Sequence, residues 1–365
     1  MIRPHWTLKL LVSWIAVLSI AYSALSLLRH NHFQSGGFDL GIYDQAVWQY
    51  AHFQWPYNTI KDRFILGDHL TLTLPLLAPL FWLWDDARML LIFQAFWISF
   101  SAVAIYKLAL RRGLTEITAL CLSIVYSLFY GIQYLVYFDF HPVVIGVGLL
   151  AWTAYFLESG KTKWLIPVIL LLLFTQENMG FALAGLGFIY VFRQKFRKIS
   201  IGFIIGGMVY SLAASRVIAF FSPVGFEYQP EIPLNPLVII SRFFDHPEKR
   251  QVWWWSFASF SFLPLFSPGA VLAVVSDLAQ YFITGDHFVQ MWTPFKHHRA
   301  VLGVFLALGT IDALVLLRRK RFVILLFGVA IILQYVLHLP LNKLVKAEYW
   351  KEEQWMTDNR KLFTL

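Results

Sequence analysis

The chain has 365 residues, of which 58% are hydrophobic and only 14% charged, and its formal net charge is +9. Ordinary soluble domains carry about 25% charged residues. This chain also contains apolar runs, such as residues 8–28 and 90–110, that match the length needed to cross a lipid bilayer. Composition therefore excludes an ordinary soluble protein. Because backbone polar groups in lipid are satisfied only within helices or closed barrels, runs of this length predict transmembrane helices.

The apolar runs predict an all-α, polytopic integral membrane protein with about eleven transmembrane helices. They lie near residues 6–28, 88–110, 116–134, 141–157, 164–175, 179–192, 199–222, 251–266, 270–283, 300–317 and 322–339. Residues 1–339 then form one transmembrane domain with a long first outward loop at 29–87. The fifth and sixth segments are short and closely spaced, so an alternative is one kinked hairpin within the membrane.

The distribution of lysine and arginine predicts the orientation of these helices. When the N-terminus is placed in the cytoplasm, the short basic clusters at 111–112, 193–198 and 318–321 all fall on the cytoplasmic side. The C-terminus is then extracytoplasmic, and residues 340–365 start an extracytoplasmic segment that we expect to be truncated here. This distribution accounts for the positive net charge, so we expect no nucleic acid partner.

The outward loops carry most of the residues suited to chemistry, beginning with two acids just after the first helix. Asp39 and Asp44 are candidate catalytic residues, because a carboxylate there could deprotonate an acceptor hydroxyl beside the membrane. The structural alternatives are a helix N-cap for Asp39 and a solvated helix face for Asp44.

Asp68-His69 and Asp139-x-His141 repeat one pairing of an acid with a histidine on the predicted outward side. We predict that these four residues bind substrate. No cofactor is certain, but if a divalent metal ion binds, Asp39, His69 and His141 are its ligands, since carboxylate and imidazole suit such ions to differing degrees. Hydrogen bonds between loops are the structural alternative for the same residues.

Further carboxylates fall beside or within the predicted helices. Glu177, flanked by Gln176 and Asn178, falls between two predicted helices, at the membrane surface or below it. An ionisable residue inside a membrane is energetically costly, so it is a candidate functional residue. We predict that all three bind substrate. Asp277 and Asp312 interrupt later helices and are the main support for a transporter, with polar helix ends as the simpler explanation.

Two basic sites are candidates for binding a phosphate. Arg216, near the outward end of its helix, could clamp a phosphate through two hydrogen bonds or extend to the interface. The cluster His297-His298-Arg299 is the second candidate, and interfacial anchoring is its alternative.

The order of these motifs resembles an uncharacterised prokaryotic family of multi-spanning membrane proteins with only a domain-of-unknown-function label. The resemblance covers most of the chain and rests on Phe38-Asp39-Leu40-Gly41-Ile42-Tyr43-Asp44-Gln45, Gly67-Asp68-His69, Phe138-Asp139-Phe140-His141-Pro142 and Gln176-Glu177-Asn178. That family is in turn similar to the GT-C membrane glycosyltransferases. By this likeness Asp39 takes the place of the catalytic acid in the first outward loop, although Leu40 stands where many GT-C enzymes have a second acid.

The resemblance implies a GT-C-like fold in the cytoplasmic (inner) membrane of a prokaryote. It implies transfer of a sugar from a polyprenyl-phosphate donor to an acceptor on the extracytoplasmic side, with membrane lipids and that donor as partners. Two alternatives stay open, namely a lipid or glycolipid transporter or flippase, and a non-catalytic lipid-binding membrane protein.

Overall fold

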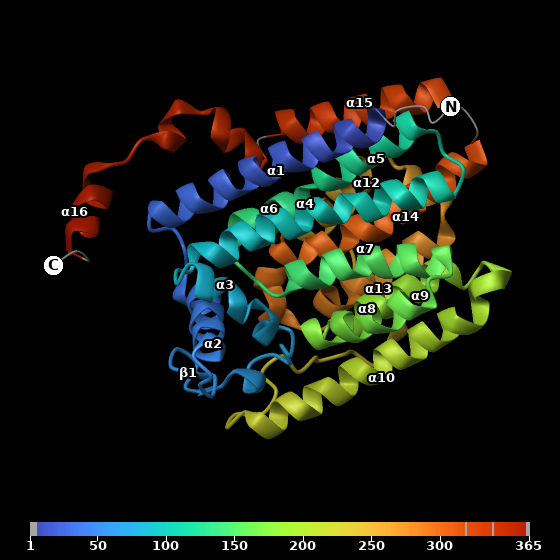
Figure 1. Cartoon of the computed structure of the whole chain (residues 1–365). Helices are drawn as coiled ribbons and strands as arrows, with labels where there is room; N and C mark the ends of the chain where they lie inside the picture. Colours follow the sequence, from blue (N-terminus) through green and yellow to red (C-terminus); the bar gives the residue numbers. More distant parts are fainter. Residues whose placement is uncertain (1–5, 318–319, 338, 363–365) are drawn as a thin grey trace.

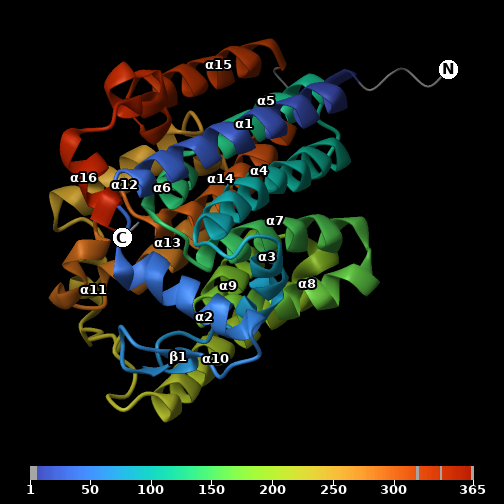
Figure 2. The same cartoon turned by 60° about the vertical axis from the view of Figure 1, so that its left-hand side comes forward.

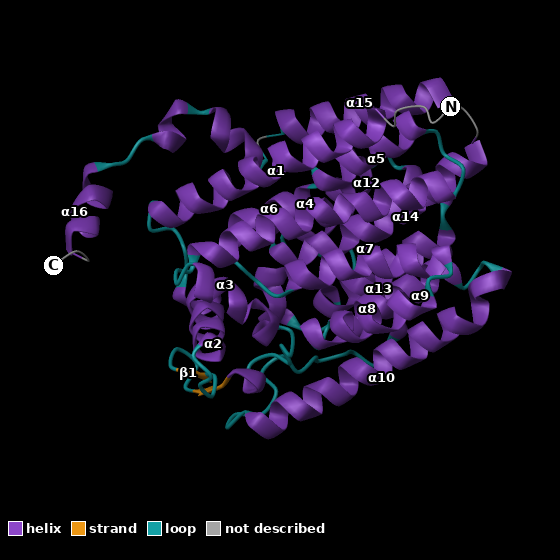
Figure 3. Cartoon of the chain, in the orientation of Figure 1, coloured by secondary structure: helices purple, strands orange, loops and turns teal. Residues whose placement is uncertain are grey.

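The computed structural model describes residues 6–317, 320–337 and 339–362. Figure 3 shows that most of the described chain is helical, with loops and turns joining the helices. Within the described residues the only strands are β1 (Tyr57–Asn58) and β2 (Arg63–Phe64), which pair antiparallel in the first long loop. The prediction of an all-α protein is therefore confirmed.

The long helices lie side by side with their axes roughly parallel (Figure 1). The α-helices of the described chain are α1 (Trp6–Asn31), α2 (Ile42–Ala51), α3 (Ala78–Leu83), α4 (Arg88–Arg111), α5 (Glu116–Ser127), α6 (Tyr130–Phe138), α7 (Val143–Ser159), α8 (Thr162–Thr175), α9 (Met179–Tyr190), α10 (Arg197–Phe221), α11 (Pro236–Ser241), α12 (Pro247–Ala258), α13 (Pro268–Phe282), α14 (Ala300–Leu317), α15 (Lys320–Val336) and α16 (Gln354–Leu362).

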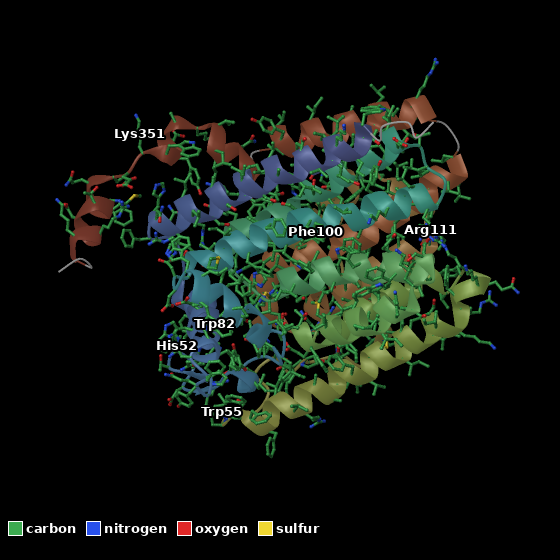
Figure 4. The ribbon with its side chains drawn as sticks, viewed as in Figure 1. His52, Trp55, Trp82, Phe100, Arg111 and Lys351 are labelled. Carbon is green, nitrogen blue, oxygen red and sulfur yellow. The ribbon has the colours of Figure 1, made fainter. Side chains whose placement is uncertain are left out.

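Contacts between helix termini define two opposite ends of this bundle. At one end, which we call the basic end, the Arg111 side chain at the end of α4 donates a hydrogen bond of 2.6 Å to the Glu158 carbonyl oxygen near the end of α7. At the other, which we call the loop end, Arg29 near the end of α1 pairs with Asp139 just after α6 at 2.6 Å. Figure 4 shows Arg111 at the basic end and His52 at the loop end.

In the part of the chain that the structure describes, four helical segments are long and apolar enough to cross a membrane, and the pair α5–α6, bent by 42°, is a fifth if it counts as one span. The four are Trp6–Asn31, Arg88–Arg111, Gln194–Phe221 and His297–Leu317. The prediction of about eleven spans is not confirmed by this measure, because the other predicted segments form helices too short to meet it. Helix α8, for example, has 14 residues and α9 has 12.

The long loops fold into short elements that cover the loop end. The apolar stretch after His69, which contains Pro75 and Pro79, forms a 3-10 turn and α3, and both pack on α2. Figure 2 brings this end forward and shows α2, β1 and α11 there. The residues between α10 and α11 are irregular, as the run of prolines predicts.

The basic end is held together by a buried network of charges. The Arg112 guanidinium donates to the Glu158 carboxylate and, at 2.6 Å, to Asp312. Arg193 reaches the same Asp312 oxygen at 2.5 Å, and the Ser267 hydroxyl donates to its second oxygen at 2.7 Å. Asp312 therefore has a structural role in joining α14 to its neighbours, which weakens its support for a transporter.

We expect Glu158→Gln to lower the thermal unfolding midpoint of the protein in detergent, followed by tryptophan fluorescence. Arg112 is only 5% exposed, and removing one partner of a buried ion pair costs about 3–5 kcal/mol. The matched control is Glu348→Gln, because Glu348 is exposed. If the two variants melt at the same temperature, the network adds no net stability.

Candidate functional site

Four histidines from three separate loops meet at the loop end of the bundle. The ring centroids of His69 and His141 are 6.0 Å apart, those of His141 and His297 are 4.3 Å apart, and those of His297 and His298 are 3.9 Å apart. We call these four residues the histidine cluster. The structure thus brings together motifs that the sequence places far apart.

Two glycines allow the backbones that carry these histidines to approach neighbouring elements. A Cβ atom at Gly67 would lie 2.6 Å from the Phe221 carbonyl oxygen at the end of α10. A Cβ atom at Gly131 in α6 would lie 2.6 Å from the backbone of Arg299. Both contacts are with backbone atoms, so a side chain at either position would displace the loop that places His69 or His297-His298.

His69 forms an ion pair with Glu177. The His69 Nδ1 and Glu177 Oε1 atoms are 2.8 Å apart, and the backbone N–H of Leu70 donates to the other Glu177 oxygen at 3.3 Å. Burial opposes the charged imidazole, but the Glu177 and Asp68 carboxylates outweigh it and raise the pKa of His69 to about 9. Glu177 thus fixes the first loop to the junction of α8 and α9 and keeps His69 positively charged at neutral pH.

Asp139 fixes the segment that follows α1. Its carboxylate accepts a hydrogen bond of 2.6 Å from Arg29 and one of 2.9 Å from the backbone N–H of Gly36. Burial raises the pKa of Asp139, although the Arg29 charge and these hydrogen bonds oppose the shift. Asp139 therefore has a positioning role, because Gly36 directly precedes the π-helix (Gly37–Gly41) that contains Asp39.

Asp39 lies in the first turn of that π-helix, and the residue at the N-cap is Gly36, so Asp39 is not the helix N-cap. Among the described residues its carboxylate has no hydrogen-bond or ion-pair partner. Burial raises the pKa of Asp39, with a further contribution from the negative charge of Asp139. Lys296 and His69 are its positively charged neighbours. The result is a half-buried, unpaired carboxylate beside the histidine cluster.

The structure places two of the predicted site residues, Asp44 and Arg216, outside this arrangement, and a third, Arg299, beside it with most of its guanidinium engaged. The charged neighbours of Asp44 are Asp85 and Asp86, and burial together with these charges raises its pKa to about 6. Arg216 lies on the exposed face of α10. Arg299 is fully buried; its Nε and Nη2 donate hydrogen bonds to backbone carbonyl oxygens in the loop before it, while Nη1 has no hydrogen-bond partner among the described residues.

Sequence analysis missed several residues that complete the site. The Tyr43 hydroxyl lies 3.3 Å from His141 Nε2, and the Tyr228 ring stacks on His69 with centroids 4.9 Å apart. Lys61 approaches the Asp68 carboxylate at 3.4 Å. Tyr43 lies within the motif at 38–45 and Lys296 directly precedes the cluster His297-His298-Arg299, so the sequence could have identified both. Lys61 and Tyr228 lie in loops, and no sequence pattern indicates which residues they contact.

The geometry does not support the predicted metal site. Among the described residues no group of three or more histidine, cysteine, aspartate and glutamate side chains is placed to hold a metal ion. His69 Nδ1 is bound to Glu177, and His141 Nε2 faces the Tyr43 hydroxyl. The Asp39, His69 and His141 set therefore lacks converging donor atoms.

We expect NMR of ¹⁵N-histidine-labelled protein to show His69 titrating near pH 9, well above the ordinary value of 6.5. Because its pKa is raised in the folded state, the Glu177 pair stabilises the fold fully below about pH 6.5, and this contribution is lost as the pH rises through about 9. The stability difference between the wild type and Glu177→Gln should therefore shrink across that window. A His69 pKa at or below 6.5 would contradict the ion pair.

The family of membrane proteins described as "Predicted membrane protein (DUF2079)" matches residues 29–360. This match covers the histidine cluster, Asp39 and all the predicted spans but the first. Comparisons with curated proteins and with solved structures found no match. The GT-C likeness of the fold thus stays a prediction. Since the family match extends over most of the sequence, the chain belongs to the DUF2079 family of membrane proteins.

Proposed function

We propose that this protein transfers a sugar from a polyprenyl-phosphate donor to an acceptor hydroxyl, and that the reaction takes place at the loop end on the extracytoplasmic side. The observation that carries the proposal is the unpaired, half-buried Asp39 carboxylate beside the histidine cluster. In the same loops, Asp139 and Glu177 are held by hydrogen bonds and ion pairs, so Asp39 is the carboxylate free to exchange a proton.

In the proposed reaction Asp39 acts as the general base. It takes the proton of the acceptor hydroxyl while the acceptor oxygen forms a bond to the anomeric carbon of the sugar. The bond between that carbon and the phosphate oxygen breaks, and polyprenyl phosphate leaves with the electron pair. The raised pKa of Asp39 suits this role, because a base is most effective when its pKa approaches the operating pH.

Lys296 is our candidate for holding the donor phosphate. It is a charged neighbour of Asp39, its ammonium lies 5.1 Å from the centroid of the Phe138 ring, and it has no carboxylate partner within 4 Å among the described residues. An unpaired ammonium is a ready partner for a phosphate oxygen. We prefer Lys296 to Arg299, whose Nε and Nη2 already donate to carbonyl oxygens, and to Arg216, which lies on the exposed face of α10.

The distribution of charge between the two ends of the bundle supports the proposed orientation. The basic end contains Arg111, Arg112 and Arg193, as expected of a cytoplasmic face. With that orientation the histidine cluster and Asp39 face outward. A polyprenyl chain would then lie in the bilayer while its phosphate reaches the interface.

Replacing Asp39 by Asn should reduce sugar transfer by about 10²–10⁴-fold, the usual contribution of a general base. The assay is transfer from a radiolabelled polyprenyl-phosphate sugar in proteoliposomes. Asp286→Asn is the matched control, because Asp286 is an exposed carboxylate at the same end and should retain activity.

Thermal unfolding of both variants distinguishes a lost base from a lost fold. An Asp39→Asn protein that melts with the wild type and transfers sugar at the wild-type rate would refute the assignment of the base. A wild-type protein that transfers no sugar from any polyprenyl-phosphate donor, but moves such lipids between leaflets, would favour the flippase alternative.

A further inference from the structure

Two buried histidines at the site have no hydrogen-bond partner. His297 and His298 are 4% and 8% exposed, and within the described chain both nitrogens of each ring are unpaired. Asn178 Oδ1 is unpaired as well, and Tyr281 lies between it and the histidines, since Tyr281 neighbours the Asn178 side chain and its ring stacks on His298 with centroids 5.2 Å apart. Leaving a buried polar group unpaired is unfavourable, so these five atoms favour a site that binds a polar ligand.

The hydrogen-bond donors and acceptors of these side chains determine which kind of ligand can bind. In the described chain neither ring pairs with a carboxylate, and the adjacent charged residues, Lys296 and Arg299, are both positive. Burial and like charge both favour the neutral imidazole, which has one N–H donor and one acceptor nitrogen. The two rings and the Asn178 carbonyl oxygen therefore present two donors and three acceptors.

This mixed set matches hydroxyl groups better than an ion. A phosphate only accepts hydrogen bonds, so three acceptors of the protein would face it unpaired. A hydroxyl group donates one hydrogen bond and accepts others, and a sugar ring presents several hydroxyls side by side. Acidic sugars fit less well, because an ionised carboxylate only accepts hydrogen bonds and would leave acceptors of the protein unpaired.

We infer that His297, His298 and Asn178 bind the hydroxyl groups of an uncharged sugar ring. This inference rests on the proposed function for the position of the ring beside Asp39, and it adds the class of sugar that the site accepts. His141, whose ring lies 4.3 Å from that of His297, connects this subsite to His69 and Glu177.

Saturation-transfer NMR on the protein in nanodiscs tests the inference. The ligands are methyl glycosides of neutral hexoses, a methyl glucuronide and inorganic phosphate, and each is measured with and without added Zn²⁺. The matched variants are His298→Phe and His298→Gln. Phe preserves a ring that can stack on Tyr281 but removes both nitrogens, whereas Gln keeps a donor and an acceptor. Thermal unfolding confirms that both variants fold, and His52→Ala controls for loss of an exposed histidine.

We expect neutral glycosides to bind the wild type, His298→Phe to weaken binding by about tenfold or more, and His298→Gln to retain most of it. Preferred binding of glucuronide or phosphate, a Zn²⁺ requirement, or equal binding by His298→Phe would each overturn the inference. The proposed function is tested separately, because glycosides can bind to a protein that transfers no sugar. Conversely, an active enzyme unaffected by His298→Phe would refute only the inference.

Discussion

The arrangement of the site depends on the ion pair between Arg29 and Asp139. This pair joins the end of α1 to the loop after α6, and the same Asp139 carboxylate binds the backbone of Gly36. The π-helix that carries Asp39 begins immediately afterwards. A long loop would otherwise have many conformations, and fixing each residue costs about 1–2 kcal/mol of backbone entropy. One partly buried ion pair therefore determines where the unpaired carboxylate lies.

Charged residues thus fall into two groups with different roles. At the basic end, Arg112, Glu158, Arg193 and Asp312 satisfy one another and hold the helices together. At the loop end, Asp139 and Glu177 are paired, while Asp39, His297 and His298 retain unpaired polar atoms. Buried polar groups are normally satisfied within a protein, so their concentration at one place favours a ligand-binding site over a purely structural one.

Sequence reasoning succeeded where a local pattern determines the outcome. Most apolar runs coincide with observed helices, and motif order predicted the family, because both depend on neighbouring residues. The run at 116–134 instead forms the bent pair α5–α6, and the run at 251–266 extends beyond the end of α12. The sequence does not determine the surroundings of Asp44 and Arg299, which are set by tertiary contacts with Asp85, Asp86 and loop carbonyl groups. Lys61 and Tyr228 were missed for the same reason, since only the folded loops bring them to Asp68 and His69.

The most direct test is a lipid-resolved electron cryo-microscopy structure of the protein purified from its native membrane. Our account predicts a polyprenyl phosphate whose phosphate lies between Lys296 and Asp39, with its chain along the helices and its head group at the histidine cluster. Bulk phospholipid alone around the bundle, with Asp39 turned away from every bound lipid and His297 and His298 paired only with water, would contradict it.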